Sequence, residues 1–236
     1  MLLQAALNGP FSKSDHPATP VSADEMARDA VACVAAGAGA IHLHPRDADG
    51  RERLDAGIVD AVVEQVRAAC GVPVGVSTGA WIEPDLERRV TLVRGWRAPD
   101  YASLNVSEGG WERVGQALLD AGVGIEAGVW TVAEAQAFAA SDLAGRVLRV
   151  LLEPVDAGED ALGLVDEIHR ALDAGGVTAP RLQHGDSTAT WVLLGDAVAR
   201  GLDTRVGLED TQHDPDGTLT AGNAALVAAA AKILPG

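Results

Sequence analysis

The sequence predicts a closed (β/α)₈ barrel, and three observations support this prediction. Eight short runs rich in β-branched residues alternate with longer, Ala-rich amphipathic runs. The 236 residues divide into eight units of about 30, which is close to the size of one strand–helix repeat. No linker or low-complexity stretch marks a second domain, so we expect residues 1–236 to form one compact barrel with short loops.

Eight strands are expected, each an apolar run that ends in polar residues. In order they are Leu2–Gly9, Ala40–Arg46, Val72–Gly79, Tyr101–Ser107, Val123–Trp130, Val147–Pro154, Ala179–Gly185 and Thr204–Asp210. Strict alternation of such strands with helices implies a parallel sheet with right-handed crossovers. A doubly wound open sheet is the alternative. Neither a G-x-G-x-x-G after the first strand nor a Walker A pattern occurs, which disfavours dinucleotide and P-loop folds.

The runs between the strands carry the start and stop signals of helices. Ser22–Glu25 and Thr131–Glu134 are capping-box patterns, in which a hydroxyl and a carboxylate each accept from a backbone N–H; Asp156–Glu159 has a similar spacing. Pro84 suits the first turn of the third helix. Glycines that we expect to end helices just before a strand are found at positions 37, 71, 122, 175 and 201.

The charge balance excludes several classes of function. The chain has 18 Lys+Arg against 34 Asp+Glu, a formal net charge of −16, whereas nucleic-acid and anionic-membrane binders carry basic patches. Its 47% hydrophobic content argues against a disordered acidic chain. Only two cysteines are present, no charge-free stretch is long enough to span a membrane, and the first residues lack the basic region of a signal peptide. We therefore expect a cytoplasmic protein.

Polar residues gather at the ends of the predicted strands. These residues are Asn8, His42, His44, Arg46, Ser77, Thr78, Asn105, Ser107, Glu126, Glu153, Gln183, His184, Arg205, Glu209 and Asp210. Strand C-termini surround the active site of a (β/α)₈ barrel, and buried polar groups are costly unless they are paired or used. A functional pocket is expected at this end. Trp81 and Trp130 follow strand ends, where they either line the pocket or pack beneath it.

His42 and His44 are the most specific candidates for metal ligands in the sequence. Residues i and i+2 of a strand point to the same side, so both imidazoles are expected at the barrel mouth, where they suit a first-row metal. Glu209 ends the eighth strand and could complete a His₂Glu site that leaves a position open for substrate. The alternative is a hydrogen-bonded structural pair, and His184 is a rival or additional ligand. His169, by contrast, is expected on a helix surface.

Arg205 and Asp210 flank Glu209 on the same predicted strand. Period-2 counting turns Arg205 and Glu209 to one side, with Arg205 deeper, where it could clamp a carboxylate or fix Asp210. Asp210 lies at the strand–loop junction and could accept a proton. The alternative is a structural salt bridge. Ser77 and Thr78 offer two hydroxyls, although the same residues suit a turn with a helix cap.

An ordered series of motifs resembles the β-keto acid cleavage enzymes, also called 3-keto-5-aminohexanoate cleavage proteins. The motifs are Asn8-Gly9, Pro17-x-x-Pro20-x-Ser22-x-x-Glu25, Ala36-Gly37-Ala38, His42-Leu-His44-Pro-Arg46-Asp47-x-Asp49-Gly50, Ser77-Thr78-Gly79, Arg205-Val-Gly-Leu-Glu209-Asp210, Gly217 and Asn223. The resemblance covers nearly the whole chain. The second and eighth strands carry its most specific blocks.

The resemblance implies a (β/α)₈ homotetramer whose divalent metal, normally zinc, is held by His42, His44 and Glu209. It implies a retro-Claisen exchange in which a β-keto acid and acetyl-CoA give acetoacetate and a new acyl-CoA. Arg205 and Asp210 match the family's catalytic Arg and Asp. Substrate is expected to be bound by Asn8, Arg46, Ser77, Thr78, Asn105 and Ser107.

Two features bear on substrate and coenzyme. The family member that cleaves the amino-substituted keto acid has a carboxylate soon after the first N-G, where this chain has Pro10, Phe11, Ser12 and Lys13. A neutral acyl tail is therefore expected. The phosphates of CoA require cations. Candidate cations are Arg46, Arg88, Arg89, Arg94 and Arg181.

Two other functions remain open from the sequence. One is a metal-dependent barrel hydrolase or lyase that does not use CoA. Amidohydrolases carry H-x-H on the first strand rather than the second, and the only lysines, Lys13 and Lys232, lie outside strands, which disfavours a Schiff-base aldolase. The other is a barrel that binds metal without catalysis.

Overall fold

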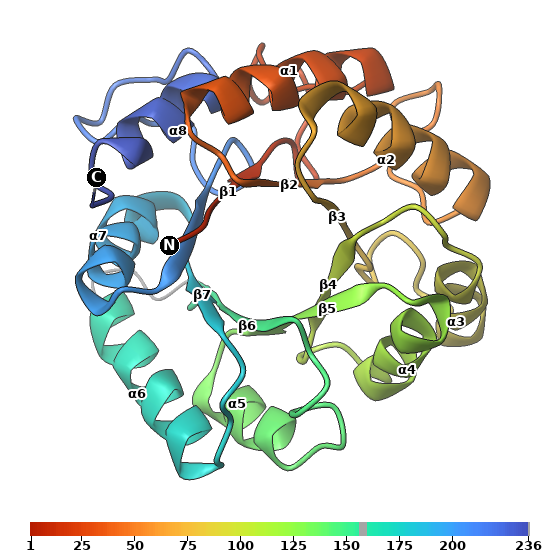
Figure 1. Ribbon diagram of the computed structural model, residues 1–236, viewed down its shortest axis with the longest axis vertical. Coiled ribbons are helices and arrows are strands. Elements are labelled where there is room, and N and C mark those ends of the chain that lie inside the picture. The colour runs from red at the N-terminus through yellow and green to blue at the C-terminus, as the bar shows by residue number, and fades with distance from the viewer. Residues whose placement is uncertain (156–159, 236) are drawn as a thin grey trace.

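Eight parallel strands pair in sequence order and close into a barrel, because β8 pairs with both β7 and β1. The computed structural model describes residues 1–155 and 160–235. The strands are β1 Leu3–Ala6, β2 Ala40–Leu43, β3 Val74–Ser77, β4 Tyr101–Asn105, β5 Gly124–Val129, β6 Arg149–Leu152, β7 Arg181–Gln183 and β8 Asp203–Val206. The predicted fold class is confirmed (Figure 1).

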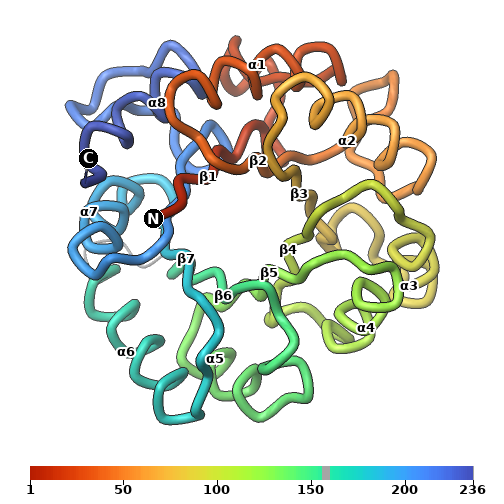
Figure 2. The backbone as a smooth tube through the Cα atoms, in the orientation of Figure 1, coloured from red at the N-terminus to blue at the C-terminus, as the bar shows by residue number. Residues whose placement is uncertain are grey.

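Helices form a ring outside the strands, and the last helix lies beside the first (Figures 1 and 2). The helices are α1 Ala23–Ala36, α2 Ala56–Cys70, α3 Leu86–Arg94, α4 Trp111–Ala121, α5 Val132–Ala139, α6 Ala161–Ala174, α7 Thr190–Arg200 and α8 Asn223–Ala231, with a 3₁₀ turn, η2, at Ser187–Ala189. Among the described residues, no helix has both the length and the apolar character that a membrane crossing requires.

The predicted caps are largely correct. Ser22 closes a capping box with Glu25, and the side chain of Thr131 accepts from the N–H of Glu134. The expected glycines cap helices at positions 37, 71, 122, 175 and 201. The Pro84 prediction is wrong, because Asp85 is the N-cap of α3 and the helix begins at Leu86. The Asp156–Glu159 pattern lies outside the described residues.

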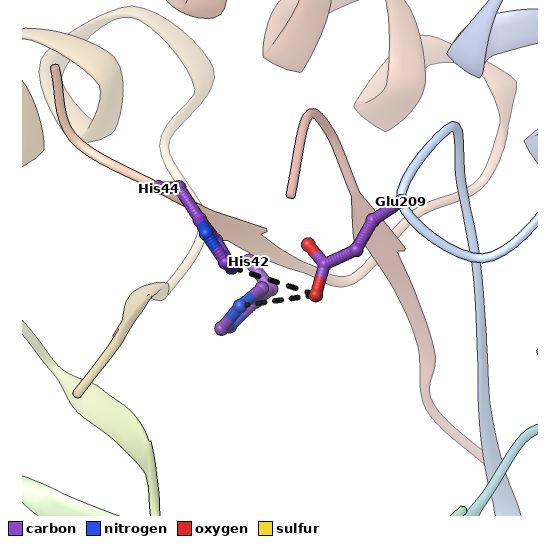
Figure 3. A group of neighbouring side chains, drawn as sticks. All are labelled: His42, His44 and Glu209. Atoms are coloured by element: carbon purple, nitrogen blue, oxygen red, sulfur yellow. Dashed lines mark ion pairs between the residues drawn. The ribbon is translucent and has the colours of Figure 1, made fainter. Parts of the chain in front are cut away.

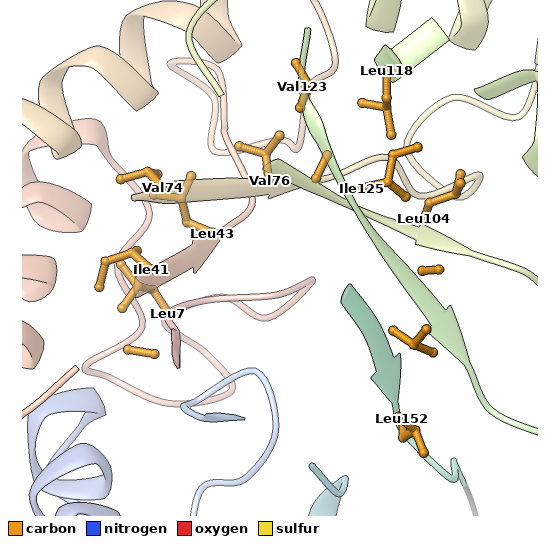
Figure 4. Close-up of a cluster of buried hydrophobic side chains, with 14 of the residues drawn as sticks. Leu7, Ile41, Leu43, Val74, Val76, Leu104, Leu118, Val123, Ile125 and Leu152 are labelled. Carbon is orange, nitrogen blue, oxygen red and sulfur yellow. The ribbon is translucent and has the colours of Figure 1, made fainter. Parts of the chain in front are cut away.

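The hydrophobic core lies between the strands and the helices. Alternate strand residues such as Ile41, Leu43, Val74 and Val76 point outward into it (Figure 4). This arrangement places the other set of strand side chains inside the barrel, where the polar residues of the strands meet.

A polar layer fills the inside of the barrel, which the sequence did not lead us to expect. Gln4 donates to the Tyr101 hydroxyl (3.1 Å) and to Glu126 (2.8 Å), and the Arg149 guanidinium lies 3.0 Å from the same carboxylate. Glu126 is fully buried in mid-strand β5, so its predicted place among the residues at the mouth is wrong. Burial raises its pKa, and the nearby Arg149 opposes that effect.

Candidate functional site

A cavity of about 310 Å³ opens at the C-terminal mouth of the barrel. Its lining residues are Pro10, Phe11, His44, Ser77, Trp81, Ser103, Asn105, Trp130, Leu151, Glu153, Asp186, Arg205 and Glu209. Several of these residues were predicted to be the last residues of strands. In the structure they lie just beyond the strands, because the observed strands are shorter than the predicted ones. The pocket expected from the polar strand ends is therefore present.

His42, His44 and Glu209 converge at this mouth (Figure 3). The Nε2 atoms of both histidines lie 3.6 Å from Oε1 of Glu209, and the two rings meet edge to face at 78°. Ligand atoms about 2.0–2.2 Å from one tetrahedral cation lie roughly 3.4 Å apart. Oε2 of Glu209 is buried without a hydrogen-bond partner among the described residues. The spacing and chemistry of these donors fit a divalent cation.

The three groups have strongly altered proton affinities. Burial lowers the pKa of His42 to about 3. Burial also acts to lower the pKa of His44, but the carboxylates of Glu209 and Glu52 outweigh it and raise that pKa to about 9. Burial acts to raise the pKa of Glu209, yet Arg205 and the two histidines hold it well below its usual range.

Glu52 contacts the site, although the sequence analysis missed it. Its Oε1 lies 2.5 Å from Nδ1 of His44 and accepts from Nε1 of Trp81 at 3.3 Å. The Trp81 ring is stacked on His44 at 6.1 Å and lines the cavity. Glu52 lies on the loop after β2, and the only hint in the sequence was its closeness to the H-x-H motif.

Arg205 joins Glu209 to Asp210. Its guanidinium donates to Oε1 of Glu209 at 2.7 Å and to Oδ1 of Asp210 at 2.7 and 3.0 Å. Strand β8 ends at Val206, and a turn closed by the Asp210 N–H on the Gly207 carbonyl brings Asp210 to the same side as Glu209. A side chain at position 207 would collide with the Ala6 carbonyl, so only glycine allows this close passage over β1.

Asp210 also belongs to a second cluster, with Glu153 and His184. Burial raises the pKa of Asp210 to about 7 and that of Glu153 to about 8, and it lowers that of His184. Nδ1 of His184 lies 3.6 Å from Asp210, whereas its Nε2 lies 3.8 Å from Glu153. Because the two carboxyls face opposite ring nitrogens of His184, a cation bound to one of these nitrogens would lie away from one of the carboxyls, and this cluster fits a cation less well than His42, His44 and Glu209 do.

The predicted substrate-binding residues fall into two groups. Ser77 and Asn105 line the cavity, together with Ser103, which the sequence analysis did not single out. Thr78 is buried and donates to the Ser103 carbonyl at 2.8 Å, and Ser107 lies exposed on a turn; neither lines the cavity.

The side chains of Asn8 and Arg46 form hydrogen bonds with backbone groups and do not line the cavity. The fully buried Asn8 amide accepts from the N–H of His44 at 2.9 Å and donates to its carbonyl at 3.1 Å. Arg46 donates to the carbonyls of Gly9 at 2.8 Å and Phe11 at 2.5 Å. Both residues thus fix the loops that carry the site.

The candidate cations for CoA are already paired. Arg46 donates to backbone carbonyls. The other four form ion pairs, which are Arg88–Glu83, Arg89–Glu108, Arg94–Asp120 and Arg181–Asp173.

The prediction that His169 lies on a helix surface is wrong, because its buried ring contacts Gln183 at 2.8 Å and Arg181 at 2.8 Å.

Comparison with known proteins identifies similar sequences and similar folds. The family model described as beta-keto acid cleavage enzyme matches residues 1–147 and 161–235. A 3-keto-5-aminohexanoate cleavage enzyme of Fusobacterium nucleatum subsp. nucleatum is 36% identical over 91 residues, which cover 37% of this chain and 34% of that enzyme.

Solved structures of ObcA resemble the barrel. The apo structure gives a TM-score of 0.71 at 18% identity, and the ternary complex of ObcA with C4-CoA adduct and oxalate gives 0.73 at 18%. Each alignment covers 92% of this chain, which spans only 61% and 63% of those chains. At this identity the likeness shows a common fold.

Proposed function

The chain belongs to the β-keto acid cleavage enzyme family, and on that premise we propose that it exchanges acyl groups between a β-keto acid and acetyl-CoA. The products are acetoacetate and a new acyl-CoA. One observation carries the proposal: His42, His44 and Glu209 converge beside the Arg205–Asp210 pair at the barrel mouth, where His44, Arg205 and Glu209 line the cavity. Asp210 lines an adjoining pocket that shares Glu209 with this cavity.

The exchange balances without water or an oxidant. The bond between C2 and C3 of the keto acid breaks, and C2 with its carboxylate forms a new bond to the acetyl carbonyl carbon, which gives acetoacetate. The CoA sulfur released from acetyl-CoA takes the remaining acyl group. The protein therefore has to bind a carboxylate and a ketone, and to move the proton at C2.

His42, His44 and Glu209 are the residues that would hold the divalent cation, most simply zinc, with a coordination position left for substrate. When bound, the cation supplies a Lewis acid that polarises the ketone oxygen. Asn8 supports this set by holding both backbone groups of His44.

Asp210 is proposed as the base that takes the C2 proton and returns it. Its carboxyl is buried, and Arg205 fixes it with two N–H groups at 2.7 and 3.0 Å. The same guanidinium contacts Glu209, so base and cation ligand keep a fixed relative position. Burial raises the pKa of Asp210 to about 7, which suits proton exchange near neutral pH.

Ser77 and Asn105 are proposed to orient the substrate carboxylate, since both line the cavity. The acyl tail would then extend along the adjoining wall of the cavity, where Trp130 follows β5 and Leu151 lies in β6. These apolar side chains favour a neutral, apolar tail. A homo-oligomer, which sedimentation would measure, is proposed from the family alone.

The test uses zinc-loaded protein with acetyl-CoA labelled in its acetyl group and a panel of neutral β-keto acids. Labelled acetoacetate and a new acyl-CoA should form together, as seen by mass spectrometry. Asp210→Asn should lower kcat by about 10²–10⁴-fold while cation binding persists. His42→Ala should lose both cation and turnover, whereas His213→Ala, at an exposed histidine, should keep both.

The outcomes separate the competing functions. Cleavage of a substrate without CoA would favour a hydrolase or lyase, and cation binding with no turnover over a broad panel would favour a non-catalytic barrel. Turnover retained in His42→Ala would refute the ligand assignment.

A further inference from the structure

We propose that Glu52 is a positioning residue that sets the ring of His44 for cation binding and ties Trp81, at the rim of the cavity, to the same carboxylate oxygen. The inference rests on the cation site of the proposed function. It does not depend on which reaction the site performs.

Glu52 contacts both His44 and Trp81 through one carboxylate oxygen. Its Oε1 is 2.5 Å from Nδ1 of His44, and the same oxygen accepts from Nε1 of Trp81 at 3.3 Å. The Glu52 side chain is 17% exposed and that of His44 is 3% exposed, so the contact is largely shielded from water. Trp81 is 51% exposed and stacked on the imidazole.

The backbone around Glu52 is held rigidly. Arg46 and Glu52 form an antiparallel bridge, and the N–H of Arg53 donates to the Pro45 carbonyl at 2.9 Å. Within the turn, the Asp47 side chain accepts from two backbone N–H groups and contacts Arg53 at 2.7 Å. The loop therefore returns Glu52 to the histidine that ends the H-x-H motif.

The contact between Glu52 and Nδ1 of His44 determines how the other ring nitrogen, Nε2, can bind a cation. A neutral histidine that donates Nδ1–H to a carboxylate must present the lone pair of Nε2, and the carboxylate makes that nitrogen a stronger donor to a cation. In His44, Nε2 is the atom that faces Glu209 at 3.6 Å. Nδ1 of His42, in contrast, is buried without a hydrogen-bond partner among the described residues. Only one of the two histidines is thus oriented by a carboxylate.

The contact with Trp81 extends this effect to the cavity rim. Gly79 lies directly under the Trp81 ring, since a Cβ there would be 2.4 Å from it. The indole is consequently held between Gly79, His44 and Glu52. A cation that fixes His44 should also restrict Trp81, because both donate to one oxygen.

The test measures cation affinity and the Co²⁺ absorption spectrum in the wild type, Glu52→Ala, Glu52→Gln and a control, Glu64→Gln. Glu64 is exposed on α2 and contacts none of the ligands. Glu52→Ala should weaken Zn²⁺ and Co²⁺ binding by about 10–100-fold. Glu52→Gln keeps an acceptor oxygen without the charge, so its affinity should be intermediate and its Co²⁺ bands shifted. Glu64→Gln should match the wild type in both measurements.

The results distinguish a failure of the role given to Glu52 from a failure of the cation site itself. If the wild type binds the cation and both Glu52 variants bind it equally well with unchanged spectra, Glu52 has no positioning role and the cation site stands. If the wild type binds no cation, both proposals fail. Circular dichroism of each variant separates loss of affinity from loss of fold, and recovery in Glu52→Gln excludes a purely structural effect.

Discussion

Asp29→Asn should stabilise the protein at alkaline pH. Asp29 lies on α1, and its Oδ2 accepts from Nδ2 of Asn223 at the start of α8. The same amide donates to the Leu7 carbonyl, so this contact lies where both helices meet the end of β1. Burial raises the pKa of Asp29 from 3.8 to about 6, with the Asn223 hydrogen bond opposing the effect.

The size and sign of the effect follow from this pKa. A carboxyl whose pKa rises on folding contributes its stability below the unfolded pKa of 3.8 and loses it as the pH rises through about 6. Two pKa units correspond to up to ~3 kcal/mol of destabilisation above that range. Asparagine keeps an acceptor oxygen for Asn223 and carries no charge. For a chain of this size, ~1–3 kcal/mol corresponds to an increase in Tm of roughly 2–12 °C.

Thermal melts at about pH 8, 6 and 4 would check the prediction. The Tm difference between Asp29→Asn and the wild type should be largest at the highest pH and should vanish toward the lowest. Asp142→Asn, at an exposed aspartate, should show no such trend. An Asp29→Asn protein that is less stable than the wild type at high pH, or equally stabilised at every pH, would refute the reasoning.

Two further predictions concern the cavity. Ser77→Ala removes a hydroxyl that lines the cavity and that also accepts from the N–H of Gly79 at 3.1 Å, so it should raise KM for the keto acid and cost ~1 kcal/mol of stability. Thr78→Val removes a buried bond to the Ser103 carbonyl and should cost a similar ~1 kcal/mol with KM nearly unchanged. Steady-state kinetics with thermal melts would check both, and a raised KM in Thr78→Val but not in Ser77→Ala would contradict the assignment. Leu151→Phe narrows the wall at β6 and should lower kcat/KM for long acyl tails about 10-fold more than for short ones; an unchanged chain-length profile would place the tail elsewhere.

Much of the fold could be predicted because its signals are local. Capping boxes at Ser22 and Thr131 and helix-ending glycines are short patterns, and they are present as predicted. The H-x-H pair was also local, since residues two apart on a strand share a face. Their convergence with Glu209 followed from the closed barrel, which brings β2 and the end of β8 to the two sides of β1.

Other parts of the site depended on contacts between distant segments. Period-2 counting could not place Asp210, because the turn after Val206 overrides the strand pattern. Asn8 and Thr78 could not be distinguished in the sequence from residues that bind substrate. In the structure the side chain of each is hydrogen-bonded to a backbone group of another segment. Glu52 became visible only when its loop folded back onto His44.

The sequence by itself therefore determined the barrel, most of its helix ends and most of the polar residues at its mouth, because these depend on periodicity and on neighbours within one or two turns. Only the tertiary structure decided which of those polar residues face the cavity and which are already hydrogen-bonded. A buried polar side chain bonds to whichever group the fold brings near it, and that partner can lie anywhere in the chain.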